Sequence, residues 1–258
     1  MKESYRVLDG AESFFIEGSK VGILLSHGFM GTPQSVRHLG VKLSQLGYTV
    51  FAPLLTGHGT YPHDLENATH GDWISDLEAG YKYLNERCST IFVMGQSMGG
   101  ALSLWLANKY PNINGVITIN AALSIPDYEY LVGKTSPRFL PEGPPDIRLK
   151  GVQEITYDMV PLRAIHEIQA LMKKTPDIIP TINQPILCFK SIVDHVVPPE
   201  NTDYILDHVG SIQKEAVTLY HSYHVASMDH DKDEIIKKTH AFIQGVSAKS
   251  TTQQMVFS

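Results

Sequence analysis

Ser97 lies in a Gly-x-Ser-x-Gly pattern, Gly95-Gln96-Ser97-Met98-Gly99, which is a candidate site for a nucleophile. The apolar residues 91–94 before it predict a short buried strand, and the apolar spacing of residues 101–110 predicts a helix. A tight strand-turn-helix connection needs glycine on both sides of the serine, because the turn strains the backbone and brings strand and helix close together. The pattern therefore predicts a serine hydroxyl exposed at the carboxyl end of a strand. The alternative is a glycine-rich turn with a solvent-facing serine.

A serine hydroxyl attacks a carbonyl at neutral pH only when a base removes its proton and an anion orients that base. The chain offers both groups at later strand ends. Asp194 follows a predicted strand at residues 186–191, and His224 follows the last predicted strand, residues 215–220. The order nucleophile, acid, histidine, each after a successive strand, is that of the α/β-hydrolases. The spacing predicts a catalytic triad of Ser97, Asp194 and His224.

Other residues compete for two of these roles. Asp203 and Asp207 fall within a predicted helix, and Asp127 falls within an inserted segment, so Asp194 is the preferred acid. His195 beside it is expected to pack or to face solvent. His221 also ends the last strand, three residues before His224, and both remain candidate bases from their position alone. We prefer His224, because the two residues between them let the chain leave the strand and turn back toward the serine.

An oxyanion needs two hydrogen-bond donors near the nucleophile. The backbone N–H of Met98 opens the helix after Ser97 and is one candidate, because an N-terminal helix amide has no partner within the helix. The second is expected from the loop after the predicted strand 21–26. There the backbone N–H of Phe29 follows His27-Gly28, and the Phe29 ring is expected to line the acyl pocket.

The elements around these residues predict an α/β fold. Strands and helices alternate as far as residue 121, which indicates a mostly parallel sheet with helices on both faces and ligand sites at the strands' carboxyl ends. A proline-interrupted, apolar segment at residues 122–181 breaks this alternation and predicts an inserted cap of short amphipathic pieces. The core is expected to comprise residues 1–121 and 182–247, followed by a flexible tail, 248–258. The predicted strands are 13–17, 21–26, 48–53, 115–120, 186–191 and 215–220, and the helices are 33–45, 69–88, 101–110, 200–208 and 232–243.

Composition narrows the classes of partner. The chain has 258 residues, 43% of them hydrophobic, and a formal net charge of −6 without any basic run. Neither nucleic acid nor an anionic membrane surface is therefore expected as a partner. Cys88 and Cys188 have no metal-ligand spacing and predict reduced core thiols rather than a disulfide. The first ten residues lack the apolar core of a signal peptide, and no run is long enough to span a bilayer, so a soluble cytoplasmic protein is expected.

Taken together, the motifs resemble those of the small bacterial monoacylglycerol lipases and closely related carboxylesterases. The resemblance runs from about residue 23 to residue 242, and its joint motifs are specific. The motifs that carry it are His27-Gly28-Phe29-Met30-Gly31, Thr56-Gly57-His58-Gly59, Gly95-Gln96-Ser97-Met98-Gly99-Gly100, Asp194-His195-Val196-Val197-Pro198 and Tyr223-His224-Val225.

The resemblance implies an α/β-hydrolase fold, a compact cap and a cofactor-independent, metal-independent esterase with a tunnel for one acyl chain. It also implies that Ser97, Asp194 and His224 form the triad and that Phe29 and Met98 form the oxyanion hole. A cap carboxylate in these lipases helps to hold the glycerol head, and Glu154 occupies a matching place here. Glu154 is equally compatible with a solvated position. The Gly143-Pro144-Pro145 run is less bulky than the family pattern, which leaves acyl-chain length open.

The expected function is hydrolysis of monoacylglycerols and short-to-medium acyl esters through an acyl-enzyme on Ser97. A general carboxylesterase without glycerol preference is the nearest alternative. An acyltransferase or a carbon–carbon bond hydrolase would use the same scaffold with a different acceptor or substrate. A non-catalytic binding protein of the same fold is a different class, and the complete set of three catalytic residue types argues against it.

Overall fold

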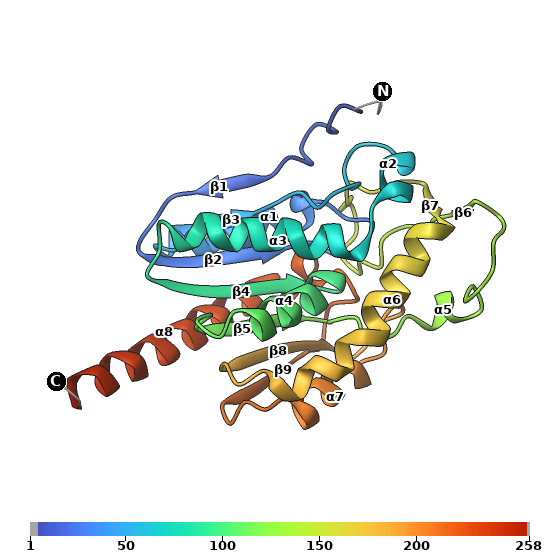
Figure 1. Cartoon of the computed structure of the whole chain (residues 1–258). Coiled ribbons are helices and arrows are strands. Elements are labelled where there is room, and N and C mark those ends of the chain that lie inside the picture. Colours follow the sequence, from blue (N-terminus) through green and yellow to red (C-terminus); the bar gives the residue numbers. More distant parts are fainter. Residues whose placement is uncertain (1–4, 257–258) are drawn as a thin grey trace.

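The computed structural model describes residues 5–256 and has a seven-stranded sheet at its centre. The strand order is β1-β3-β2-β4-β5-β8-β9. Strand β1 pairs antiparallel with β3 at one edge, and the other neighbours pair in parallel (Figure 1). The predicted fold class, a mostly parallel sheet with helices, is confirmed. The strands are β1 (Phe14–Ile16), β2 (Val21–Ser26), β3 (Thr49–Ala52), β4 (Thr90–Gln96), β5 (Gly115–Ile119), β8 (Ile186–Ser191) and β9 (Lys214–Leu219).

Helices cover both faces of this sheet because the strands are apolar on both sides. In β2, Leu24 packs into one core cluster, whereas Ile23 and Leu25 pack into the other, as the alternation of side chains along a strand requires. The Leu24 side contains α3 (His70–Asn85), α4 (Met98–Lys109) and α7 (Glu200–His208), and the other side contains α1 (Pro33–Gln45) and α8 (Lys232–Val256).

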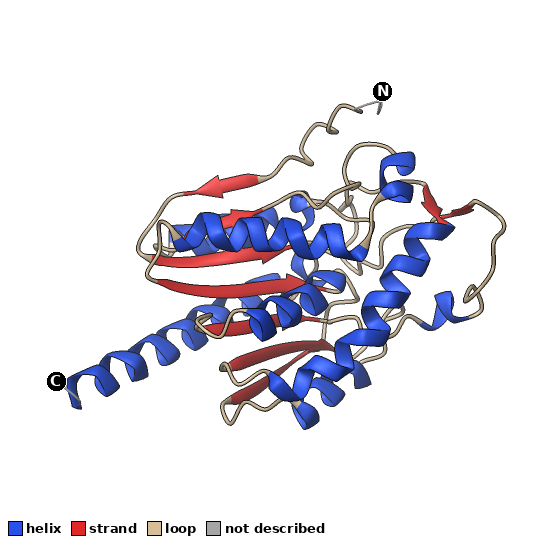
Figure 2. Cartoon of the chain, in the orientation of Figure 1, coloured by secondary structure: helices blue, strands red, loops and turns tan. Residues whose placement is uncertain are grey.

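The segment after β5 departs from the sheet. It contains α5 (Pro126–Glu129), a two-stranded sheet of β6 (Phe139–Pro141) and β7 (Met159–Pro161), α6 (Leu162–Ile178) and the 3₁₀ turn Ile179–Thr181. Figure 2 shows the β6–β7 pair apart from the main sheet, beside the start of α6. Helix α5, the β6–β7 pair and the start of α6 lie toward the carboxyl ends of the parallel strands, and α6 then runs back alongside the sheet (Figure 1). We refer to residues 122–181 as the cap.

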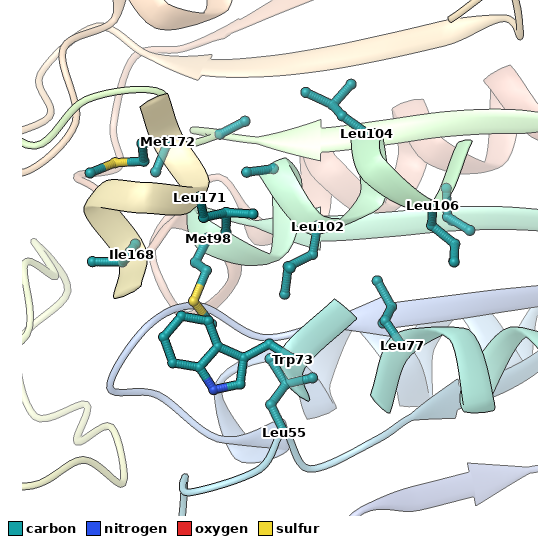
Figure 3. Close-up of a cluster of buried hydrophobic side chains, with 14 of the residues drawn as sticks. Leu55, Trp73, Leu77, Met98, Leu102, Leu104, Leu106, Ile168, Leu171 and Met172 are labelled. Carbon is teal, nitrogen blue, oxygen red and sulfur yellow. The ribbon is translucent and has the colours of Figure 1, made fainter. Parts of the chain in front are cut away.

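Side chains of α6 anchor the cap on the core. Ile168, Leu171 and Met172 are buried in the cluster that contains Met98 and Trp73 (Figure 3). Apolar burial of this extent makes the cap a packed part of the domain. Hydrogen bonds also join the cap to the core. The Tyr157 hydroxyl donates to the Gly57 carbonyl at 2.9 Å and accepts from the Thr60 N–H at 2.7 Å.

The largest differences from the sequence prediction concern three helices. Helix α6 runs for 17 residues rather than as short pieces, since Pro176 falls in its last turn, where the helix is about to end. A short helix, α2 (Pro62–Asn67), forms where none was predicted. Helix α8 continues to Val256 through the segment predicted to be a flexible tail, because no proline follows Lys232 to stop it.

No helix within residues 5–256 has both the length and the apolar character that crossing a bilayer requires.

Candidate active site

Ser97 occupies the turn between β4 and α4, and its backbone has φ 56° and ψ −121°. This conformation is strained for a residue with a side chain, and such strain is often retained at functional sites. A Cβ atom at Gly95 would collide with the Gly99 carbonyl, so the two flanking glycines let the strand and the helix approach each other. The Ser97 N–H donates to the Ile119 carbonyl of β5 at 2.8 Å, which fixes the turn to the sheet.

His224 and Asp194 lie next to Ser97 in one hydrogen-bonded row. The Nε2 atom of His224 is 2.8 Å from the Ser97 hydroxyl oxygen, and its Nδ1 atom is 2.7 Å from Asp194 Oδ2. The side chains of His224 and Asp194 are 8% and 1% exposed. The structure thus brings together the three residues expected from the sequence, in the geometry in which a histidine can accept a proton from a serine.

Two backbone amides hold the Asp194 carboxylate in place. Its Oδ1 atom accepts hydrogen bonds from the N–H groups of Val196 at 2.9 Å and Val197 at 2.8 Å. Oδ2 is left to face His224. Because one oxygen is occupied by two donors, the carboxylate has one orientation, and its Oδ2 is the acceptor for a proton on His224 Nδ1. With that tautomer of the imidazole, Nε2 is the acceptor that faces Ser97.

The predicted oxyanion donors are unpaired. Among residues 5–256, the N–H groups of Phe29 and Met98 donate to no protein acceptor. The loop that carries Phe29 passes close to the serine, because a Cβ atom at Gly28 would lie 3.2 Å from Ser97 Cβ. Two free amides beside a nucleophile can stabilise negative charge on a reacting oxygen. The Met98 side chain points away into the core, where it lies beside Trp73 (Figure 3).

Hydrogen bonds of His27 hold the Phe29 loop in place. It is fully buried, and burial lowers the pKa of His27 to about 3, so the ring is neutral. Its Nε2 accepts from the Leu55 N–H at 3.2 Å, and its Nδ1 therefore donates to the Gly28 carbonyl at 2.9 Å. The neutral ring links the loop after β2 to the loop after β3.

A pocket of about 100 Å³ opens above Ser97, between the core and the cap. Phe29 lines it, as the sequence predicted, and so do the carboxyl-bearing side chains of Glu142, Asp146 and Glu154. The Glu154 carboxylate lies against the Phe29 loop, because a Cβ atom at Gly31 would come within 2.6 Å of its Oε1. The pocket thus has an aromatic side and an acidic cap side.

Burial raises the pKa of two of these carboxyl groups. Desolvation raises the pKa of Glu154 to about 7, although nearby His224 and the Ser35 hydroxyl act in the opposite direction. Burial raises the pKa of Glu142 to about 7 as well, and its charge adds to the shift at Glu154. A carboxyl group with a pKa near 7 is partly protonated at neutral pH, and the protonated form can donate as well as accept a hydrogen bond, which suits a hydroxyl-bearing ligand.

Glu154→Gln is expected to stabilise the protein above pH 7 and to change little at pH 4. A raised carboxyl pKa gives stability that is complete below the unfolded value of about 4.5 and is lost as the pH rises through the folded value of about 7. Glutamine cannot ionise, so at pH 8 the variant should gain on the order of 2 kcal/mol, or about 4–8 °C in Tm. Thermal denaturation at pH 4 and pH 8 measures the difference. Equal changes at both pH values would attribute the effect to packing instead.

The competing residues lie elsewhere. His221 is exposed, and its N–H donates to Asp231 at 2.8 Å. Asp203 pairs with Lys190 at 2.6 Å on the surface. His195 packs on the ring of Tyr223 and its Nδ1 is 2.8 Å from Asp146 Oδ1. None of these three side chains contacts Ser97 in the described part of the chain.

Two polar residues at the site were missed by the sequence analysis. Asn120 follows β5 with φ 46°, and its side-chain amide donates to the His224 carbonyl at 2.8 Å and to the Ser191 hydroxyl at 2.9 Å. Its position directly after a central strand was the available signal. Asp146 comes from the cap and accepts from the His224 N–H at 3.1 Å. No local pattern marked it, because its partners are about 50 and 80 residues away in the chain.

Comparison with known sequences identifies the family of the chain. A family model described as serine aminopeptidase, S33 (hydrolase 4), matches residues 18–231. The chain is 44% identical over 246 residues to a thermostable monoacylglycerol lipase of Bacillus sp. strain H-257, covering 94% of this chain and 98% of that protein. It is 27% identical over 238 residues to a carboxylesterase of Bacillus subtilis strain 168, covering 90% of this chain and 95% of that protein.

Solved structures support the same grouping. A metagenome-derived lipolytic enzyme superposes with a TM-score of 0.90 at 41% identity, covering 93% of this chain and all of that one. A soluble variant of monoglyceride lipase from Saccharomyces cerevisiae shares the fold at a TM-score of 0.78 and 20% identity, with 94% of each chain covered. The resemblance inferred from the motifs is confirmed. The chain therefore belongs to the hydrolase 4 family, and within the α/β-hydrolase fold it is a carboxylic ester hydrolase of the lipase and esterase group.

Proposed function

We propose that the protein is a monoacylglycerol lipase that works through an acyl-enzyme on Ser97. The observation that carries this proposal is the row of Ser97, His224 and Asp194, with separations of 2.8 Å and 2.7 Å. The monoacylglycerol substrate is supported by the 44% identical Bacillus relative and by an acidic pocket wall that suits a polyol.

In the proposed acylation step, His224 Nε2 takes the proton of Ser97 as the serine oxygen attacks the ester carbonyl. Asp194 stabilises the imidazolium that forms, and the N–H groups of Phe29 and Met98 bind the developing oxyanion. His224 then donates its proton to the departing alcohol oxygen. In deacylation His224 takes a proton from water, and the water oxygen attacks the acyl carbonyl. The bond between the acyl carbon and the Ser97 oxygen then breaks, His224 returns the proton to that oxygen, and the fatty acid leaves.

The cap side of the pocket is the proposed site for the glycerol head. Glu154 lies against the Phe29 loop and lines the pocket with Ser97. It is therefore placed to hydrogen-bond a hydroxyl of the leaving alcohol while the acyl chain extends away from it. A single ester linkage with a small polar alcohol fits this pocket better than a triacylglycerol, whose leaving group carries two further acyl chains.

The direct test compares hydrolysis of 1-monolauroylglycerol with that of the matching di- and triacylglycerols and of p-nitrophenyl butyrate. We expect kcat/KM to be highest for the monoglyceride. Faster turnover of the aryl ester would identify a general carboxylesterase, the activity named for the Bacillus subtilis relative. Product analysis in the presence of glycerol separates hydrolysis from acyl transfer, because a transferase would form a new ester instead of free fatty acid.

Glu154→Gln is expected to lower kcat/KM for 1-monolauroylglycerol about tenfold and to leave p-nitrophenyl butyrate within about twofold. A hydrogen bond is worth about 0.5–1.5 kcal/mol, and a tenfold change in kcat/KM corresponds to about 1.4 kcal/mol. Asp158→Asn changes an exposed cap carboxylate and serves as the matched control. Equal losses on the two esters would show that Glu154 supports the site generally and does not recognise the alcohol.

A further inference from the structure

Asp146 belongs to the cap, yet its side chain contacts both loops that flank Ser97. Its Oδ2 atom accepts from the backbone N–H groups of His195 and His224, each at 3.1 Å. Its Oδ1 atom lies 2.8 Å from His195 Nδ1, and its side chain is 16% exposed. The carboxylate therefore joins the loop that follows β8, where Asp194 lies, to the loop that follows β9, where His224 lies.

Further hydrogen bonds join the cap to the loop that carries His224. The Asp146 carbonyl also accepts from that loop, from the Val225 N–H at 3.1 Å. In the opposite direction, the buried Asp229 accepts from the Arg148 N–H of the cap at 2.7 Å, and it also accepts from the Tyr223 N–H at 2.9 Å. The cap carboxylate Asp146 thus binds a backbone N–H of the loop that carries His224, and the core carboxylate Asp229 binds a backbone N–H of the cap.

These contacts determine where the histidine stands. The peptide groups of His224 lie beyond the end of β9, so no sheet hydrogen bond holds them. Its N–H donates to Asp146 at 3.1 Å, and its carbonyl accepts from the Asn120 side chain at 2.8 Å and from the nearby Ala226 N–H at 2.9 Å. Asn120 comes from the core and Asp146 from the cap. The His224 ring is therefore held between two elements that are far apart in the sequence, and loss of either would let it move relative to Ser97.

We propose that Asp146 is a positioning residue that keeps His224 and the Asp194 loop in register, so that the triad is fully assembled only when the cap segment is in place. The inference rests on the triad proposed above. Misplacement of a reacting group by about 1 Å can reduce a rate about 100-fold. A carboxylate that binds two loop amides at once is suited to prevent such a displacement.

The test uses p-nitrophenyl butyrate and expresses kcat per active site titrated with a fluorophosphonate. We expect Asp146→Ala to lower kcat about 10- to 100-fold with KM within about threefold. Asp146→Asn should restore kcat to within about fivefold of the wild type. Its amide oxygen can take the place of Oδ2 on both backbone N–H groups while its NH₂ faces His195 Nδ1.

Two control variants separate the alternatives. His195→Ala removes the ring contact but keeps both backbone bonds to Asp146, and Asp158→Ala removes an exposed cap carboxylate; each should stay within about twofold of the wild type. A variant that only folds less well would show fewer titrated sites with an unchanged kcat.

Three outcomes would overturn the inference. They are an unchanged kcat per site in Asp146→Ala, a rise in KM alone, and an Asp146→Asn variant as impaired as Asp146→Ala. A fault in the triad itself is distinguishable from these, because it would appear as undiminished activity in Ser97→Ala.

Discussion

Replacing Ser97 with alanine is expected to lower kcat for ester hydrolysis by about 10⁴- to 10⁶-fold. Ser97 is the group that forms the acyl-enzyme in the proposed mechanism, and its hydroxyl lies 2.8 Å from the base. Without it, His224 can activate only water, and the remaining acceleration comes from the oxyanion donors and from binding. The strained backbone at residue 97 is unchanged by the substitution, so the variant should fold.

The measurement is release of p-nitrophenol from p-nitrophenyl butyrate, with mass spectrometry of the protein after reaction with a fluorophosphonate. The wild type should gain one phosphonyl group on Ser97, and the variant none. Ser75→Ala is the control, because Ser75 is an exposed residue of α3 whose hydroxyl donates to the Gly71 carbonyl of the same helix. Retained activity in Ser97→Ala would exclude the acyl-enzyme mechanism.

Asp194→Asn is expected to lower kcat by about 10⁴-fold while leaving the fold intact. The Val196 and Val197 N–H groups bind Oδ1, so the asparagine must keep its oxygen there and turn its NH₂ toward His224. The histidine can then only accept at Nδ1 and must carry its proton on Nε2. That tautomer donates to Ser97 and cannot accept the serine proton.

Asp203→Asn is the matched control, since Asp203 forms its ion pair with Lys190 on the surface and should change kcat by less than twofold. Unfolding of both variants measured by circular dichroism checks that the loss in Asp194→Asn is not a loss of folded protein. A kcat for Asp194→Asn within tenfold of the wild type would remove Asp194 from the role of orienting acid.

The fold was predictable from local patterns to a large extent. Unbroken apolar runs such as residues 21–26 and 186–191 indicated central parallel strands, and these strands are present with the same bounds. Helix α1 also has the predicted bounds, because Pro33 marks its first turn and Gly47 its end. The predicted helix boundaries were wrong in two places, where a proline or a change to polar residues was taken as the end of a helix. Pro176 falls inside α6, and α8 extends beyond the predicted end.

The candidate triad was predictable because its three residues lie at strand ends. In a parallel sheet the carboxyl ends of the strands share one edge, so residues after β4, β8 and β9 are brought together whatever the chain length between them. Ser97, Asp194 and His224 follow this rule, and the structure places them in hydrogen-bonding distance. Their catalytic roles are predictions that the variants described above test.

The sequence by itself determined the sheet, the position of the nucleophile turn and the choice of residues around it, since these depend on side-chain periodicity and chain order. Only the tertiary structure decided which distant groups hold that arrangement in place. Asp146 and Asn120 bind the two sides of the His224 peptide from the cap and from the core. The raised pKa values of Glu142 and Glu154 depend on burial of these cap side chains at the pocket between the cap and the core. Hydrogen bonds to backbone amides and desolvation leave no residue pattern in the chain, because any segment can supply an amide and only packing decides which side chains lose their water.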